Sequence, residues 1–177
     1  MNLQALPEDA LKEILALTEA KKTLDLRDKA QDYFMPFAHH VYENFIEGRH
    51  HRIIAEKLEK VARGELKRLI INMPPRHSKS EFASFLMPAW FLGRNPKLKI
   101  IQATHNTELA VRFGRKVRDL IDDPQYKDIF PNTHLKEDNK GAGKWQTSAG
   151  GEYFAAGVGA AVTGRGADLF VIDDPHS

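Results

Sequence analysis

Apolar residues recur at helical spacing through the first third of the chain. Pro7–Glu19 and Leu24–Phe34 each predict an amphipathic helix, and the second is expected to end before the proline at position 36. A longer helical region is predicted over Pro36–Arg63 with a break near Gly48, and Gly64 is a helix stop. We expect residues 1–64 to form a helical region that packs on the remainder, residues 65–177.

After residue 64 the pattern changes to short apolar runs that alternate with helical segments. The expected elements are a strand over Leu66–Asn72, a helix over Phe82–Leu92, a strand over Leu98–Thr104, a helix from the cap Asn106 to Ile121, a loop over Pro131–Lys144, a hairpin of Trp145–Thr147 with Glu152–Ala156, a turn over Gly157–Gly166 and a strand over Asp168–Asp174. Alternation of strands and helices predicts an α/β fold, with a mostly parallel sheet and flanking helices.

The segment MPPRHSKS, residues 73–80, lies between the first predicted strand and the helix that follows it. A strand, a turn ending in Lys-Ser and a helix form the layout of a phosphate-binding loop, G-x-x-x-x-G-K-[ST]. Met73 and Ser78 stand where that pattern has glycine. The other interpretation of this segment is a surface turn between a strand and a helix.

In a phosphate-binding loop, each polar side chain of this segment has a role. Lys79 supplies the cation for the β- and γ-phosphates, and the Ser80 hydroxyl ligates Mg²⁺. Arg76 is a second cation near the γ-phosphate, and Ser78 is small enough for close backbone approach. The nucleotide-binding residues predicted from the sequence are Pro75, Arg76, His77, Ser78, Lys79, Ser80 and Arg165.

The run LFVIDD, residues 169–174, is an apolar strand that ends in two acids, as a Walker B element does. We expect Asp173 to hold Mg²⁺ through water, and Asp174 to orient or deprotonate the attacking water. Asp174 is one methylene shorter than the glutamate usual in such motors. A strand that ends in a polar turn is the alternative. Because both motifs occur in the right order on the right elements, we expect an ATP and Mg²⁺ site.

Further polar residues have two interpretations each. Arg165, between two glycines, is predicted to reach a phosphate in its own or a neighbouring site; the alternative is an ion pair with an acid such as Asp168. Residues 104–106 are equally consistent with nucleic-acid contact and with helix capping. The pairs His39-His40 and His50-His51 favour a solvated or structural role over a metal site, because adjacent side chains point to different helix faces.

Composition narrows the class of protein. The chain has 177 residues, 42% of them hydrophobic and 28% charged, with no cysteine and a formal net charge of +2. Disulfides and thiolate metal sites are therefore excluded, and the small net charge by itself does not indicate nucleic-acid binding. No apolar run is long enough to cross a bilayer, and no secretory signal pattern begins the chain.

Several motifs together resemble the ATPase domain of tailed-bacteriophage terminase large subunits. They are PPRHSKS at 74–80, WQT at 145–147, GGEY at 150–153, TGRGAD at 163–168 and IDDP at 172–175, and the resemblance runs from about His39 to Ser177. It implies a P-loop NTPase fold of the RecA/ASCE type that uses ATP and Mg²⁺ to move double-stranded viral DNA into a procapsid. It also implies a portal protein and a small terminase subunit as partners, a homo-oligomeric ring when full length, and the host bacterial cytoplasm.

The resemblance also concerns the end of the sequence. Family members carry a C-terminal nuclease, and no second acidic cluster is present here, so we expect no nuclease activity from this chain. The strand after Walker B usually inserts between the P-loop strand and the Walker B strand; without it, we expect a truncated product with an unfilled slot in its sheet, poorly stable and weakly active. The alternative functions are a helicase-like DNA translocase and a catalytically dead remnant that retains only binding.

Overall fold

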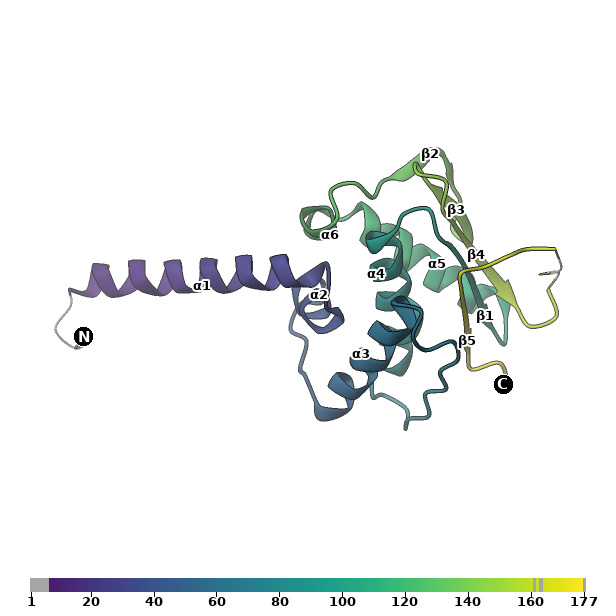
Figure 1. The fold of residues 1–177 in the computed structure, drawn as a ribbon, viewed down its shortest axis with the longest axis horizontal. Coiled ribbons are helices and arrows are strands. Elements are labelled where there is room, and N and C mark those ends of the chain that lie inside the picture. The colour runs from purple at the N-terminus through teal and green to yellow at the C-terminus, as the bar shows by residue number, and fades with distance from the viewer. Residues whose placement is uncertain (1–6, 161, 163, 177) are drawn as a thin grey trace.

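A five-stranded mixed sheet with helices beside it forms the body of the protein (Figure 1). The fold is that of a computed structural model, which describes residues 7–160, 162 and 164–176. The strand order is β2-β3-β4-β1-β5. The strands are β1 (Lys99–Thr104), β2 (Leu135–Lys140), β3 (Lys144–Thr147), β4 (Glu152–Gly157) and β5 (Leu169–Asp173).

The sheet is parallel only in part. β4 and β5 both run parallel to β1, whereas β2, β3 and β4 pair antiparallel to one another. The connections explain this division, because three residues join β2 to β3 and four join β3 to β4, and such short loops permit only antiparallel pairing. The expectation of an α/β fold is therefore confirmed, and that of a mostly parallel sheet is confirmed only for three of the five strands.

The helices lie to one side of the sheet in Figure 1, and α5 packs directly against the strands. A π-helical segment, η2, follows the predicted phosphate-binding loop and continues directly into α4. The helices are α1 (Glu8–Ala30), α2 (Phe34–Val41), α3 (Arg49–Ala62), η2 (Glu81–Leu86), α4 (Met87–Arg94), α5 (Thr107–Asp122) and α6 (Pro124–Ile129). Two predicted helix boundaries are confirmed: Gly48 is the N-cap of α3, and the Asn106 side chain accepts from the Leu109 N–H at the start of α5.

The N-terminal helices differ from the prediction. A single helix, α1, replaces the predicted pair, because the polar stretch AKKT at 20–23 consists largely of good helix formers. Helix α1 ends at Ala30, and α2 begins at Phe34 with Pro36 in its first turn. Proline is tolerated there because the first N–H groups of a helix have no intrahelical partner, so Pro36 does not end the preceding helix as predicted.

The core joins the N-terminal helices to the body. The Phe34 ring lies 5.3 Å from that of Phe82 and 5.5 Å from that of Trp90, and the Trp90 indole donates to the Ala30 carbonyl at 2.9 Å. On the neighbouring strands β3 and β4, Trp145 and Tyr153 stack with their ring centroids 4.9 Å apart. Both are fully buried, so these two aromatic rings of the hairpin belong to the core.

Residues 66–72 do not form the predicted strand. They have no regular secondary structure, and Ile70 is 85% exposed. Because β1 is already paired along both edges, a further strand could join only at a free edge of the sheet, that of β5 or that of β2. Residues 66–72 pair with neither, so β5 is an edge strand of the described sheet. Two of its apolar side chains, Phe170 and Ile172, are 54% and 58% exposed.

Two elements form that were not predicted. Strand β2 lies within the segment expected to be a loop, and helix α6 begins at Pro124, directly after α5. Of the predicted turn over residues 157–166, positions 161 and 163 lie outside the described residues. In the described part of the chain, no helix is long and apolar enough to span a membrane.

Candidate functional site

The predicted loop and the predicted acidic strand end meet at one point. Pro75 and Arg76 lie in the turn that precedes η2, and the Lys79 side chain extends to the carboxyl end of β5. Its ammonium nitrogen lies 3.5 Å from Oδ1 of Asp173 and donates a hydrogen bond to Oδ1 of Asp174. The structure thus brings together three residues separated by almost a hundred positions in the chain.

Left-handed backbone conformations gather at the same place. Among the described residues, the non-glycine positions with positive φ are Asn44 (57°), Arg76 (64°), Ser78 (62°) and Asp174 (42°), and the last three lie in the loop or at the strand end beside it. Such conformations are unfavourable for residues other than glycine and concentrate at functional sites. Ser78 stands at a glycine position of the phosphate-loop pattern and adopts the conformation that glycine favours.

Asp173 is held by a residue that the sequence analysis missed. Ser84 of η2 is fully buried, and its hydroxyl donates to Oδ2 of Asp173 at 2.9 Å. Asp173 is itself only 6% exposed, so both carboxylate oxygens are directed by specific partners, Lys79 on one side and Ser84 on the other. The signal that could have identified Ser84 is a single hydroxyl in the otherwise apolar run FASFLM.

Lys79 and the two carboxylates form an ion-pair cluster at the end of β5. The hydrogen bond to Asp174 raises the pKa of Lys79, with Asp173 adding to the effect, so the ammonium is fully charged at neutral pH. Asp174 is well exposed, with 62% of its side-chain surface accessible, whereas Lys79 is 25% exposed. An ammonium bound to an exposed carboxylate can exchange that partner for another anion at modest cost, because exposed ion pairs are weak.

The loop also contacts a cluster of histidines. The Nε2 atoms of His50 and His51 lie 3.1 Å apart, and the His77 ring lies 5.7 Å from that of His50. His51 accepts from the Gly48 N–H through Nδ1 and stacks on Phe82. Among the described residues, no group of three His, Cys, Asp or Glu side chains is arranged to hold a metal ion. The cluster therefore connects α3 to the loop by packing.

Arg165 does not lie with the loop residues. Its guanidinium is paired with Glu152 at 3.0 Å and lies over the Phe154 ring, 4.1 Å from its centroid. Glu152 pairs in register with Lys99 at the amino end of β1, whereas Asp173 pairs with Thr104 at the carboxyl end. Arg165 is thus at the opposite end of the parallel strands from Lys79, and its proposed contact with a phosphate stays a prediction.

The carboxyl end of β1 contributes backbone to the site. The His105 N–H donates to the Asp174 carbonyl at 3.2 Å, which fixes the strained residue after β5. Asn106 caps α5, and its amide lies 2.8 Å from the His105 ring. The capping interpretation of this segment is therefore confirmed, and its contact with nucleic acid is untested.

The side chains at this site are of the kinds that hold ATP with Mg²⁺. A hydroxyl, Ser80, lies at the start of the helical segment, and a buried oriented carboxylate, Asp173, ends β5. A hydroxyl with a carboxylate, completed by water and phosphate oxygens, is a common ligand set for Mg²⁺, which needs no cage of three protein carboxylates. Comparison of the chain with protein-family models, curated proteins and solved structures found no match.

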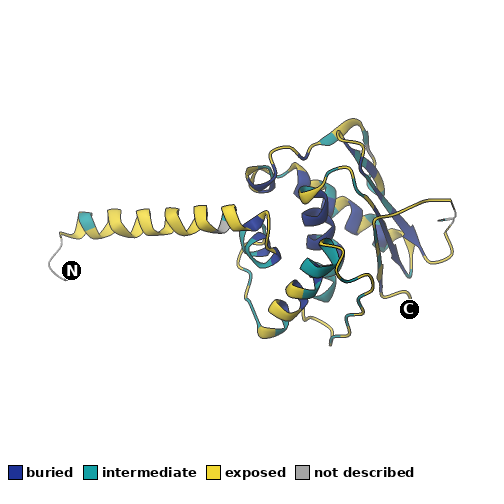
Figure 2. Cartoon of the chain, in the orientation of Figure 1, coloured by how far each residue is buried: buried dark blue, intermediate teal, exposed yellow. Residues whose placement is uncertain are grey.

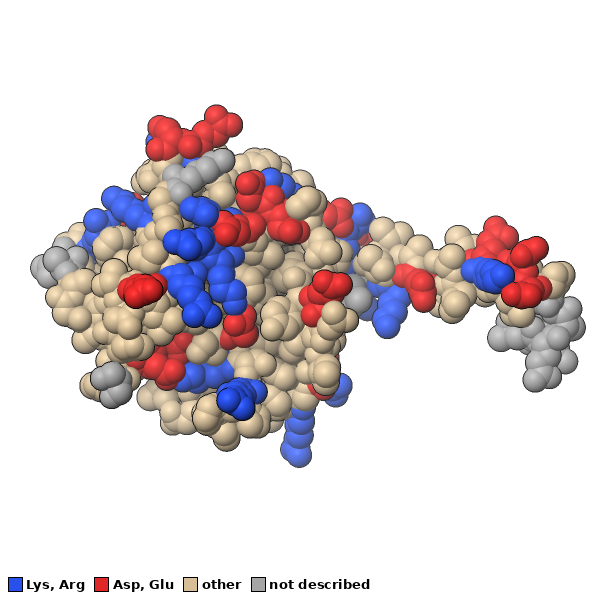
Figure 3. All heavy atoms as spheres, turned by 180° about the vertical axis from the view of Figure 1, so that it is seen from behind, with Lys and Arg blue, Asp and Glu red and all other residues tan. Residues whose placement is uncertain are grey.

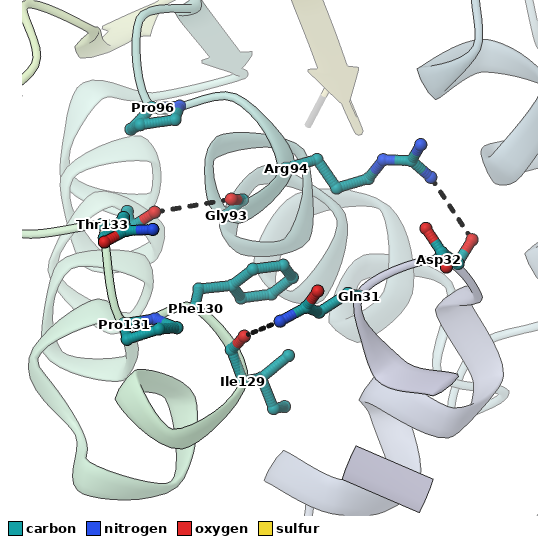
Figure 4. A pocket seen from close by; sticks show the side chains of 10 residues that line it. Gln31, Asp32, Gly93, Arg94, Pro96, Ile129, Phe130, Pro131 and Thr133 are labelled. Carbon is teal, nitrogen blue, oxygen red and sulfur yellow. Dashed lines mark hydrogen bonds between the residues drawn. The ribbon is translucent and has the colours of Figure 1, made fainter. Parts of the chain in front are cut away.

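A hollow of about 360 Å³ lies elsewhere, where α1, α4 and α6 end (Figure 4). Gln31 donates to the Ile129 carbonyl at 2.6 Å, Arg94 to the Asp32 carbonyl at 3.3 Å, and Thr133 to the Gly93 carbonyl at 3.4 Å. Each acceptor is a carbonyl at or just beyond a helix C-terminus, where intrahelical donors are missing. These polar groups therefore cap helices.

Proposed function

We propose that this chain is the ATP-binding and ATP-hydrolysing motor domain of a viral DNA-packaging terminase large subunit. The observation that carries the proposal is the placement of Lys79 between the carboxylates of Asp173 and Asp174. The left-handed conformation of Ser78 supports it, because that position requires glycine-like geometry in a phosphate-binding loop.

The residues of the site divide the chemistry between them. On nucleotide binding, Lys79 exchanges Asp174 for the β- and γ-phosphates, and the released Asp174 carboxylate is free to accept a proton from the attacking water. Asp173 keeps its hydrogen bond from Ser84, and Asp173 and Ser80 are the residues that would hold Mg²⁺. Mg²⁺ supplies charge neutralisation between the phosphates when bound. Arg76 adds a positive charge beside the γ-phosphate.

Motion of double-stranded DNA is the proposed use of this hydrolysis. The back of the molecule carries Lys and Arg side chains in a group, with acidic side chains close by (Figure 3). A mixed surface of this kind suits reversible contact with phosphates better than tight binding. The proposed further partners are the portal protein, the small terminase subunit and other copies of the large subunit in a ring.

ATP turnover by matched variants tests the proposal. Wild type, Lys79→Ala and Asp174→Asn are compared with Lys136→Ala, an exposed lysine on β2 remote from the loop. We expect turnover in the wild type and in Lys136→Ala, and none in Lys79→Ala. In Asp174→Asn we expect nucleotide binding without turnover, because the amide cannot accept the proton.

The outcomes separate the alternatives. Binding of ATP without turnover by the wild type selects the binding-only remnant, and turnover that survives Lys79→Ala refutes the site. Stimulation of ATP turnover by double-stranded DNA supports a translocase. Stimulation of turnover by a procapsid then favours packaging, whereas strand separation of a forked DNA favours a helicase-like function.

A further inference from the structure

Helix α1 extends away from the body with little to cover it (Figures 1 and 2). It has 23 residues and is about 34 Å long. Among the described residues, the contacts of α1 with the body come from its C-terminal part: Thr23 lines a hollow beside α6, Arg27 lies 3.7 Å from Asp128, and Ala30 is fully buried. Because a helix gains most of its stability in water by packing an apolar face, α1 lacks the partner that its length requires.

An apolar seam follows the exposed length of α1. Ala10, Ile14, Leu17, Lys21 and Leu24 are spaced by alternate steps of four and three residues, which is the a/d spacing of a coiled coil. Ile14 is 40% exposed, Leu17 64% and Leu24 50%. The Lys21 stem can lie along its apolar neighbours with the ammonium in water.

The seam points away from the body. The body-facing residues Thr23, Arg27 and Ala30 are spaced by one turn of the helix and define one side of α1. At 3.6 residues per turn, the seam is centred about 130° around the helix axis from that side. The α1 helix of a second molecule can therefore lie along the seam without colliding with the body of the first molecule.

The charges along α1 are divided by position. Residues 8–19 hold four acids and one lysine, a net charge of −3, and residues 20–30 hold four basic residues and two acids, a net charge of +2. In Figure 3, where α1 extends to the right, acidic side chains gather toward its outer end. Two such helices side by side in the same direction repel, and in opposite directions they attract.

We propose that the α1 seam binds the α1 seam of a second copy of this chain, antiparallel, about a two-fold axis. In this pairing Ile14 of one copy meets Leu24 of the other, and each acidic half lies along the basic half of its partner. The same patch serves on both copies, as a two-fold interface requires. The inference does not depend on the proposed function.

The association state of matched variants tests the proposal. Sedimentation velocity over a range of concentrations is measured for the wild type, Leu24→Glu and Ala16→Glu. The two variants add the same charge at exposed positions of α1, but only Leu24 lies in the seam, where it meets Ile14 in the acidic half of the partner. We expect a wild-type dimer, a dissociation constant raised about tenfold or more by Leu24→Glu, and a wild-type constant for Ala16→Glu. A monomeric wild type overturns the proposal, as does equal weakening by both variants.

Cysteine pairing tests the direction, because the natural chain has no cysteine. The variants Ile14→Cys and Leu24→Cys are oxidised in three samples: each variant alone, and an equimolar mixture of the two. In the antiparallel pair, two copies of position 14 lie about 15 Å apart along the axis, beyond the reach of a disulfide. We expect crosslinked dimers only in the mixture. Crosslinking of Ile14→Cys alone to the same extent shows a parallel pair and overturns the antiparallel assignment.

Discussion

Replacement of Ser78 by glycine should stabilise the protein, although glycine usually destabilises. Ser78 has a φ of 62°, in the left-handed region. That conformation costs a non-glycine residue about 1–2 kcal/mol, and the entropy of glycine in the unfolded chain offsets about 0.5–1 kcal/mol of the gain. We therefore expect Ser78→Gly to raise the free energy of unfolding by about 0.5–1 kcal/mol.

Ser80→Gly is the matched control, with the same change two residues further on. Ser80 has a φ of −69° and a ψ of −32°, which is ordinary helical backbone. Glycine there should lower the free energy of unfolding by about 0.5–1 kcal/mol. The two variants should thus differ by about 1–2 kcal/mol, or roughly 2–8 °C in Tm for a chain of this size.

Thermal melts followed by circular dichroism measure the difference. The reasoning requires opposite signs for the two variants. If both variants melt below the wild type by the same amount, Ser78 does not adopt the left-handed conformation, and the account of the loop is wrong.

Two further predictions concern groups close to the loop. Ser84→Ala removes a buried hydrogen-bond donor to the Asp173 carboxylate and should lower the free energy of unfolding, measured by urea denaturation, by about 1.5–3 kcal/mol. The control Ser148→Ala changes an exposed serine and should alter that free energy by less than about 0.5 kcal/mol. Equal effects of the two variants would show that the Ser84 hydroxyl contributes nothing. Burial, together with the neighbouring His50 ring, lowers the pKa of His51 from its usual 6.5, so the stability that His51 contributes is complete above about pH 6.5 and is lost as the pH falls toward the lowered value. His51→Phe should therefore lose less stability between pH 7.5 and 5.5 than the wild type does, and an equal loss contradicts this assignment.

Local signals predicted most of the elements. Asn106 accepts from the Leu109 N–H as an N-cap should, and Gly48 and Gly64 stand where helices begin and end. These features depend on residues near in sequence, so the pattern contains them. Strand β2 was missed because its residues, LKEDNK, are polar on both faces, as an edge strand permits.

Features that depend on distant partners could be predicted only where two motifs pointed to each other. Residues 66–72 have the apolar pattern of a strand, but a strand also needs a neighbour, and the pattern does not say whether one is present. The meeting of Lys79 with Asp173 and Asp174 followed from the order of two motifs, and the structure brings them together. The Ser84 bond to Asp173 spans 89 positions, and one serine in an apolar run does not indicate its acceptor.

Equilibrium binding of ATP in the presence of Mg²⁺ tests the central claim most directly, because binding is required whether or not the isolated chain turns over. The titration compares the wild type with Lys79→Ala and with Lys136→Ala as the control. Loss of a charge-assisted contact worth about 1.5–3 kcal/mol predicts binding about 10- to 150-fold weaker for Lys79→Ala, and unchanged for the control. A wild type that shows no saturable binding, or a Lys79→Ala variant that binds as tightly as the wild type, contradicts the account.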